Sequence, residues 1–99
     1  MAKFWIEGTI IDEKNMNDGL MKQHMAYTQK AMNKGSIFMS GLKTDMSGGI
    51  CIMIAENKHE VECYLQEEPL YKHGIQKYRV VEFDAHYLNE ECLDEKAYI

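Results

Sequence analysis

Proline is nearly absent from this chain, and long apolar runs are missing altogether. One proline stands among 99 residues, of which 45% are hydrophobic and 27% charged, and this composition excludes an intrinsically disordered chain. No apolar run approaches the roughly 20 residues that a membrane-spanning helix needs. The first residues, Met1–Phe4, have neither the apolar stretch nor the cleavage site of a signal peptide. We therefore expect a cytoplasmic protein with no membrane partner.

Arginine is scarce as well. Arg79 is the only arginine among eleven basic residues, and the formal net charge is -5. Proteins that bind nucleic acid usually neutralise the phosphate backbone with a basic patch, and an acidic chain with a single arginine offers little material for one. We expect no nucleic-acid partner.

Three cysteines, Cys51, Cys63 and Cys92, form an odd set without a CxxC pair, which indicates reduced, partly buried thiols and not a disulfide framework. His59 and Cys63 are four residues apart, a spacing that can bind a metal, but no third ligand lies near them in the sequence. The GxSxG, GxGxxG and GxxxxGKS/T motifs of nucleophiles and phosphate-binding loops are absent. We expect neither a metal nor a cofactor.

The hydrophobic pattern predicts four strands and two helices. Alternating apolar residues indicate strands at residues 3–11, 36–42, 50–56 and 78–84, and a period near 3.6 indicates helices at residues 19–34 and 59–66. Asn17 or Asp18 can cap the start of the first helix, and Gly35 ends it in a left-handed conformation. Pro69 ends the second helix.

The order of elements, strand, helix, strand, strand, helix, strand, is that of two β-α-β halves in succession. Right-handed crossovers wind such a chain into a four-stranded antiparallel sheet with both helices on one face. A chain of 99 residues fits a single domain. We therefore predict an α+β protein with a ferredoxin-like β-α-β-β-α-β fold, one domain over residues 1–99 with its core at about residues 3–84.

Such a sheet leaves its second face without a helix layer. We expect that face to carry both apolar and polar side chains, namely Trp5, Phe38, Cys51 and Met53 beside Glu7, Ser40 and Glu82. An exposed apolar patch of this kind usually marks an interface or a ligand site, so we expect a homodimer that pairs these faces. Residues 85–99 are predicted to form a tail or short helix that contacts the partner subunit.

One histidine lies among the apolar residues of the first helix. The arc that we expect to face the core comprises Leu20, Met21, Met25, Tyr27, Ala31 and Met32. His24 lies near the middle of this arc on a helical wheel, so it points inward. Two readings are open: a core histidine hydrogen-bonded to a backbone group, or a general acid or base whose semi-buried site keeps it able to titrate.

Several carboxylates accompany this histidine. Glu67 and Glu68 precede Pro69, which restricts the chain and can hold a carboxylate in place, although solvated carboxylates are common at the end of a helix. Asp45 lies in the predicted hairpin turn, where aspartate is also favoured for turn geometry alone.

An ordered set of motifs resembles the YCII-related (YciI-like) domain family. It comprises the H-x-x-Y helix leading to a glycine (HMAYTQKAMNKG), the strand ending in S-G (SIFMSG), a glycine-bearing hairpin, and a D-P-like dipeptide followed by a glycine (EPLYKHG). The resemblance implies a dimeric α+β barrel similar to muconolactone isomerases. It also implies an active site that uses His24 and Glu68, with Ser40 and Asp45 as pocket residues.

Two positions depart from the family pattern. Glu68 stands where the family usually has aspartate before the proline, and Gly41-Leu42 stands where it often has G-P. The extra methylene of Glu68 can shift the carboxylate by more than about 1 Å, which matters for catalysis.

The function we expect is cofactor-independent acid-base chemistry on a small organic molecule, of the isomerase or lyase type, with His24 and Glu68 as the catalytic pair. Two alternatives from other classes are a non-catalytic dimer that binds a small molecule and a structural dimer without a ligand. Turnover of a candidate substrate favours the enzyme, and saturable thermal stabilisation without turnover favours the binder.

Overall fold

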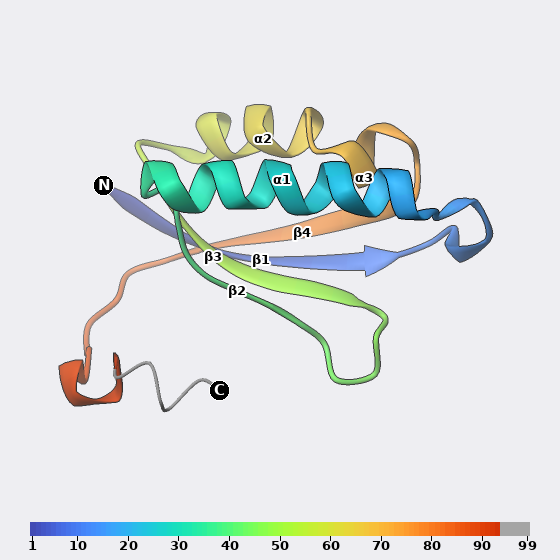
Figure 1. The fold of residues 1–99 in the computed structure, drawn as a ribbon. Helices are drawn as coiled ribbons and strands as arrows, with labels where there is room; N and C mark the ends of the chain where they lie inside the picture. The colour runs from blue at the N-terminus through green and yellow to red at the C-terminus, as the bar shows by residue number, and fades with distance from the viewer. Residues whose placement is uncertain (94–99) are drawn as a thin grey trace.

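The computed structural model describes residues 1–93, which form one sheet covered on one side by helices (Figure 1). The strands in this part of the chain are β1 (Ala2–Ile10), β2 (Ile37–Leu42), β3 (Gly48–Ala55) and β4 (Gln76–Phe83). The helices are α1 (Asp18–Lys34), α2 (Lys58–Gln66) and α3 (Pro69–Lys72), with short 3-10 helices η1 (Glu13–Asn15) and η2 (Glu90–Leu93).

The strands form an antiparallel sheet in the order β2-β3-β1-β4. Helix α1 connects β1 to β2, and helices α2 and α3 connect β3 to β4. Figure 1 shows all three helices above the same face of the sheet. The predicted ferredoxin-like α+β fold is therefore confirmed, with β1 and β3 at the centre of the sheet and β2 and β4 at its edges.

The helix ends follow local sequence signals. The Asn17 side chain accepts a hydrogen bond from the Leu20 amide at 2.9 Å and so caps α1, while Asn57 caps α2 through the Glu60 amide at 3.0 Å. Gly35 follows α1 with a φ of 86°, a left-handed conformation that glycine adopts without steric cost. The predicted boundaries of α1 are confirmed to within a residue.

The core lies between the helices and the sheet. Its fully or almost fully buried members are Phe4, Ile6, Ala31, Ile37, Met53, Ala55, Val61 and Leu65. Burying one large apolar side chain contributes about 1.5 to 3 kcal/mol to folding, so this cluster fixes the helix layer over the sheet.

The faces predicted for Cys51 and Met53 are wrong. The β1–β3 pairing places Met53 opposite Phe4 and Cys51 opposite Ile6, and opposed residues of an antiparallel pair point to the same face. Met53 is 3% exposed inside the core, and Cys51 packs against the core from its margin. The sequence pattern could not decide between the two faces, because both alternating sets of this strand are apolar.

The same registers correct Ser40 and Glu82, which were also expected on the open face. Ser40 pairs with Cys51 and Glu82 pairs with Phe4, so both lie on the helix side of the sheet. Residues whose register places them on the open face are Lys3, Trp5, Glu7, Thr9, Met39, Gly41, Gly48, Ile50, Ile52, Ile54, Lys77, Arg79, Val81 and Phe83. This face carries both apolar and polar side chains, as predicted, although its membership differs.

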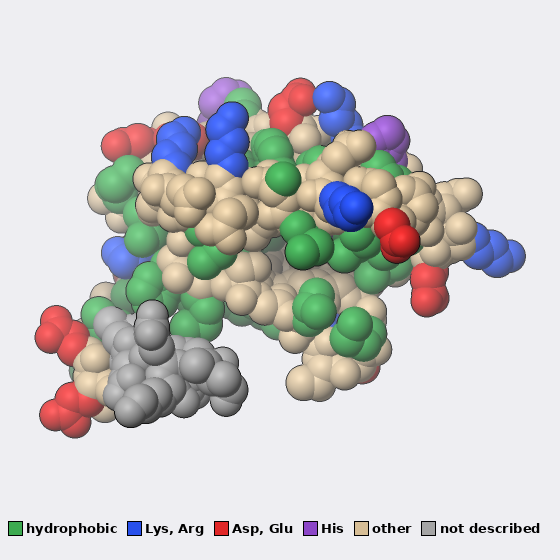
Figure 2. Space-filling view, in the orientation of Figure 1, with side chains coloured by type: hydrophobic (Ala, Val, Ile, Leu, Met, Phe, Trp, Pro, Cys, Tyr) green, Lys and Arg blue, Asp and Glu red, His purple; other side chains and the backbone are tan. Residues whose placement is uncertain are grey.

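Two methionines of α1 were expected in the core-facing arc and are exposed instead. Met25 is 62% exposed and Met32 is 39% exposed, whereas Ala31 is buried. A helix that packs over one sheet buries only a narrow stripe, so side chains at the margins of the arc remain in solvent. In Figure 2, green hydrophobic side chains reach the surface below α1, while charged side chains gather on the outer side of the helix layer.

The one-turn helix α3 was not predicted. It begins at Pro69, whose fixed φ and missing amide hydrogen suit the first position of a helix, and it follows the end of α2 at Gln66 after two residues. Periodicity cannot reveal so short a helix, because four residues complete barely one turn.

The segment after β4 extends away from the sheet and helices (Figure 1). Tyr87 is 96% exposed and Leu88 is 68% exposed, and helix η2 follows them. Residues 94–99 of the predicted tail lie outside the described residues, so its contact with a partner subunit stays a prediction. Within residues 1–93, no helix combines the length and apolar composition needed to span a membrane.

Candidate active site

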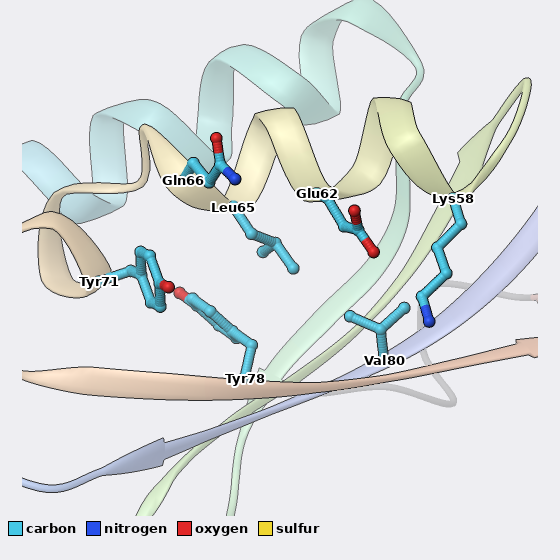
Figure 3. Close-up of a pocket in the computed structure, with 7 residues that line it drawn as sticks. All are labelled: Lys58, Glu62, Leu65, Gln66, Tyr71, Tyr78 and Val80. Atoms are coloured by element: carbon cyan, nitrogen blue, oxygen red, sulfur yellow. The ribbon is translucent and has the colours of Figure 1, made fainter.

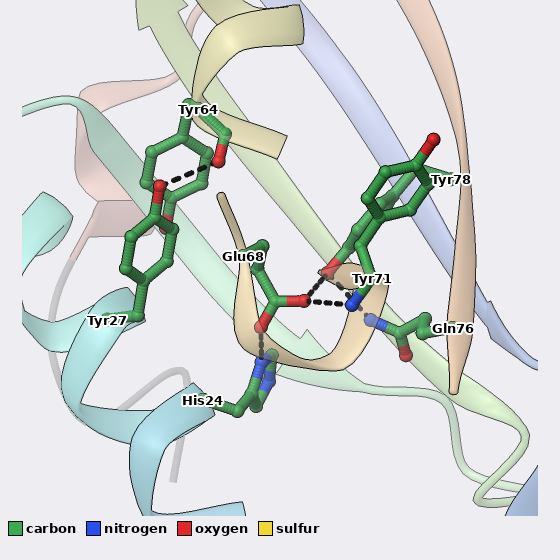
Figure 4. Close-up of polar contacts among 7 residues, drawn as sticks. All are labelled: His24, Tyr27, Tyr64, Glu68, Tyr71, Gln76 and Tyr78. Carbon is green, nitrogen blue, oxygen red and sulfur yellow. Dashed lines mark hydrogen bonds and ion pairs between the residues drawn. The ribbon is translucent and has the colours of Figure 1, made fainter. Parts of the chain in front are cut away.

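Helix α1 is held against the end of α2 by two tyrosines. The Tyr27 hydroxyl donates a hydrogen bond to the Tyr64 carbonyl at 2.7 Å, and the two rings stack with their centroids 4.7 Å apart (Figure 4). His24 precedes Tyr27 by three residues and therefore lies on the same side of α1. In the H-x-x-Y motif, the tyrosine thus fixes the position of α1 and the histidine lies on the side of α1 that faces α2 and α3.

Glu68 caps the one-turn helix α3. Its Oε2 accepts a hydrogen bond from the Tyr71 amide at 3.1 Å, and Pro69 occupies the first helical position. The carboxylate is buried, with 2% of the side chain exposed. Capping and the fixed φ of the proline hold this carboxylate in a single orientation.

The structure brings His24 and Glu68 into direct contact, although they are 44 residues apart in the sequence. The imidazole Nδ1 faces Oε1 of Glu68 within hydrogen-bonding distance (Figure 4). The His24 side chain is 25% exposed, whereas Glu68 is almost fully enclosed. The two residues therefore meet, as expected of a catalytic pair. The partner of the His24 side chain is the Glu68 carboxylate and not the backbone group that one of the two sequence interpretations held.

Two further side chains complete the site, and sequence reasoning missed both. The Tyr78 hydroxyl donates to Oε2 of Glu68 at 2.7 Å, and Gln76 Nε2 donates to the Tyr78 oxygen at 2.8 Å (Figure 4). Both come from β4, at positions two residues apart that share a face. No local signal marked them, because a tyrosine and a glutamine at the start of a strand are ordinary residues there.

The surroundings of Glu68 decide its ionisation. Burial acts to raise the pKa of Glu68, but the hydrogen bonds from His24 and Tyr78 outweigh it and leave the pKa below its ordinary value. Burial and the nearby Glu68 charge raise the pKa of Tyr78 far above its ordinary value. Glu68 is therefore an acceptor and Tyr78 a donor at neutral pH.

This arrangement determines which ring nitrogen of His24 faces Glu68. An ionised carboxylate can only accept hydrogen bonds, so Nδ1 of His24 must carry the hydrogen that points toward Glu68. In the neutral imidazole, Nε2 then holds the free lone pair. Among the described residues, none bonds to Nε2. The site can act as a general base through Nε2 and, once protonated, as a general acid.

A groove of about 300 Å³ runs between α2 and the edge strand β4 (Figure 3). Its lining residues are Lys58, Glu62, Leu65, Gln66, Tyr71, Tyr78 and Val80. Tyr78 belongs both to this groove and to the hydrogen-bonded group around Glu68. None of the lining residues was selected as a pocket residue from the sequence.

The structure does not join Ser40 and Asp45 to the histidine. Asp45 Oδ1 accepts from the Ser47 amide at 3.0 Å and from the Ser47 hydroxyl at 2.6 Å, bonds that lower the pKa of Asp45 and close the β2–β3 turn. Ser40 is exposed on the helix side of β2. Within residues 1–93 neither makes a hydrogen bond to His24 or Glu68, so their pocket roles stay predictions.

The pair His59 and Cys63 lies on the exposed side of α2. His59 Nε2 and Cys63 Sγ are 3.5 Å apart. In the part of the chain that the structure describes, no group of three or more His, Cys, Asp or Glu residues is placed to hold a metal ion.

Comparison with known proteins places the chain in a family. A search of curated proteins found no match. Among solved structures, the fold is similar to that of 5-chloro-2-hydroxyhydroquinone dehydrochlorinase from Burkholderia phenoliruptrix AC1100 in complex with 2,5-dihydroxybenzoquinone, with a TM-score of 0.62 and 22% sequence identity over 83% of this chain and 93% of that chain. The model of the YCII-related domain matches residues 6–84. The chain therefore belongs to the YCII-related domain family.

Proposed function

We propose that this protein is a small enzyme in which His24 moves a proton to or from a small organic substrate without a cofactor. The observation that carries the proposal is the contact between Nδ1 of His24 and the buried, ionised carboxylate of Glu68. A partly exposed imidazole held at one nitrogen by a carboxylate presents its other nitrogen in a fixed direction.

Glu68 acts through His24 and does not meet the substrate. Its side chain is 2% exposed, and its two oxygens already accept hydrogen bonds from three donors. We therefore assign it as a positioning residue that sets the imidazole tautomer and stabilises the imidazolium formed when Nε2 takes a proton. His24 alone carries the catalytic role first expected for both residues.

The substrate class that fits best is a small molecule from which one proton leaves as a bond shifts or a leaving group departs. Isomerisation and elimination of this kind need a base and no redox cofactor. The name of the structurally similar dehydrochlorinase describes an elimination reaction, and that protein was solved in complex with a hydroxylated quinone. Hydroxylated and halogenated ring compounds are therefore the first substrates to test.

We also propose that the protein works as a homodimer. The open face of the sheet carries Trp5, Ile52 and other apolar side chains with no helix layer over them. A contiguous apolar face on a chain this small favours pairing with a second copy across a two-fold axis.

The cytoplasm is the compartment that we propose. Cys51 and Cys63 are unbridged thiols, which is the usual state of cysteines in a reducing compartment.

The test is a thermal-shift screen of small organic compounds, followed by product analysis of every compound that stabilises the protein. We expect at least one compound to be converted by the wild type and not by His24→Gln, which keeps an N–H donor for Glu68 but has no titratable nitrogen. Glu67→Gln is the matched control and should retain activity, because Glu67 is exposed. Saturable stabilisation without conversion, equal in wild type and His24→Gln, supports a binding protein and contradicts the enzyme.

A further inference from the structure

Three elements of the fold meet at the Glu68 carboxylate. Helix α1 brings His24 to Oε1, helix α3 brings the Tyr71 amide to Oε2, and strand β4 brings the Tyr78 hydroxyl to the same oxygen. The first two contacts join helices to one another. Tyr78 is the contact that ties the carboxylate to the sheet.

The direction of the Tyr78 hydroxyl is fixed by Gln76. Gln76 is 6% exposed, and its Nε2 donates to the Tyr78 oxygen at 2.8 Å. A hydroxyl that accepts from one neighbour directs its own hydrogen toward the next acceptor, which here is Oε2 of Glu68 at 2.7 Å. The pair on β4 therefore delivers one oriented donor to the carboxylate.

Strand β1 leaves room for this pair. Gly8 lies opposite Tyr78, and a Cβ on Gly8 would come within 2.8 Å of the Gln76 amide and 3.0 Å of the Tyr78 ring. Glycine inside a strand weakens the strand and often marks a close approach, and here the approaching groups are the donors that serve Glu68. The glycine at this position of β1 thus leaves space for the side chains of Gln76 and Tyr78.

We propose that Tyr78 is a positioning residue for His24, acting through Glu68, and that it holds Oε1 at the imidazole by fixing Oε2 to the sheet. The proposal rests on the acid-base function of His24. Without the hydroxyl, the Tyr71 amide is the one donor to Oε2 that remains within residues 1–93, so the carboxylate gains freedom to rotate and loses a donor that stabilises its charge.

The experiment compares Tyr78→Phe with Tyr87→Phe. Tyr87 follows β4 and is 96% exposed, and within residues 1–93 it contacts neither Glu68 nor His24. The first readout, made without substrate, is the titration of the Glu68 carboxyl carbon by NMR. We expect Tyr78→Phe to shift this titration to higher pH because the anion loses a donor, and we expect Tyr87→Phe to leave it unchanged.

The second readout is kinetic. Misplacing a catalytic group by about 1 Å can cost about 10²-fold in rate, so we expect a loss of that order in kcat for Tyr78→Phe with little change in KM. Tyr87→Phe should keep the wild-type kcat. Equal titrations and equal kcat values in the two variants overturn the proposal.

The two readouts separate this proposal from the function on which it rests. A shifted Glu68 titration in Tyr78→Phe, together with a wild type that converts no compound, supports the positioning of the carboxylate and rejects the enzyme. If Tyr78→Phe fails to fold, Gln76→Met keeps the Tyr78 hydroxyl but removes the donor that orients it. A smaller shift in the same direction is then expected, and an unchanged titration overturns the proposal.

Discussion

The two faces of the sheet each carry a carboxylate, and the surroundings of these two carboxylates differ. On the helix side, Glu68 is 2% exposed and accepts hydrogen bonds from His24, a backbone amide and a phenol. On the open side, Glu7 is 27% exposed and pairs with Lys43 at 2.7 Å and with Arg79 at 3.5 Å. One carboxylate is enclosed by oriented donors, and the other is balanced by flexible cations.

The two carboxylates differ in whether their partners fix the direction of the side chain or only neutralise its charge. The hydrogen bond from Lys43 lowers the pKa of Glu7, yet solvent screens such a pair and its net contribution to stability is small. The donors around Glu68 hold a fixed geometry away from solvent, and so they can set the direction of a histidine. The helix side is therefore where we expect substitutions to change chemistry, and the open side is where we expect them to change assembly.

The largest expected effect comes from Glu68→Gln on the helix side. An amide offers one acceptor, so its oxygen takes the Tyr71 and Tyr78 donors and its NH₂ faces Nδ1 of His24, which moves the imidazole hydrogen to Nε2. A wrong tautomer in a comparable serine protease triad costs about 10⁴-fold, and we expect a loss of about 10³- to 10⁴-fold in kcat.

The control for this substitution is Glu67→Gln at the adjacent position. Glu67 is 65% exposed and pairs with Lys72 at 3.0 Å, so its loss should change stability by less than about 1 kcal/mol and leave kcat intact. Similar kinetics in the two variants would show that the enclosed carboxylate has no special role.

The next effect concerns assembly through the open face. Ile52 lies opposite Trp5 on that face, so Ile52→Lys places a charge in the proposed dimer interface. We expect sedimentation to show a dimer for the wild type at micromolar concentration and a monomer for Ile52→Lys. Gln23→Lys adds the same charge on the exposed side of α1 and should remain a dimer. A wild type that sediments as a monomer rejects the barrel.

A smaller effect is expected where β1 makes room for the buried hydrogen bonds. Gly8→Ala brings a methyl group to 2.8 Å from the Gln76 side chain, and overpacking of this kind costs about 1 to 3 kcal/mol. Gly41→Ala on edge strand β2 meets nothing within 4 Å and should change stability by less than about 0.5 kcal/mol. Urea unfolding of the two variants measures both values, and equal stabilities contradict the close approach.

The smallest effect appears in acid. The folded-state pKa of Glu68 lies below the ordinary value of 4.5, so the ionised carboxylate stabilises the fold above that pH, and this contribution is lost as the pH falls through the folded-state pKa. We expect wild-type stability to fall below pH 4.5 more steeply than that of Glu68→Gln, by up to about 1.4 kcal/mol per pH unit. Parallel pH profiles of urea unfolding would exclude a stabilised carboxylate.

Local signals predicted the fold well because they act within a few residues. Asn17 and Gly35 mark the ends of α1 by capping and backbone freedom alone. The faces of Cys51 and Met53 depend on which residues of β1 they oppose, and this register is a tertiary property that two equally apolar alternating sets cannot reveal.

The candidate site was predictable only in part. His24 was found from its place among apolar residues and Glu68 from the proline beside it, with the family resemblance linking the two. The Tyr78 contact depends on how β4 lies beneath α3, and nothing near Tyr78 in the sequence indicates a carboxylate partner. Asp45 was selected as a pocket residue through the family resemblance, and in the structure its carboxylate closes a turn.

The tautomer of His24 tests the central claim most directly, and it requires no substrate. Nitrogen-15 NMR of the labelled protein identifies which ring nitrogen carries the hydrogen in the neutral imidazole. The contact with Glu68 predicts the hydrogen on Nδ1 in the wild type, with Nε2 unprotonated, and the reverse in Glu68→Gln. A neutral His24 with its hydrogen on Nε2 in the wild type would contradict the account, because the nitrogen assigned to proton transfer would then have no lone pair to offer.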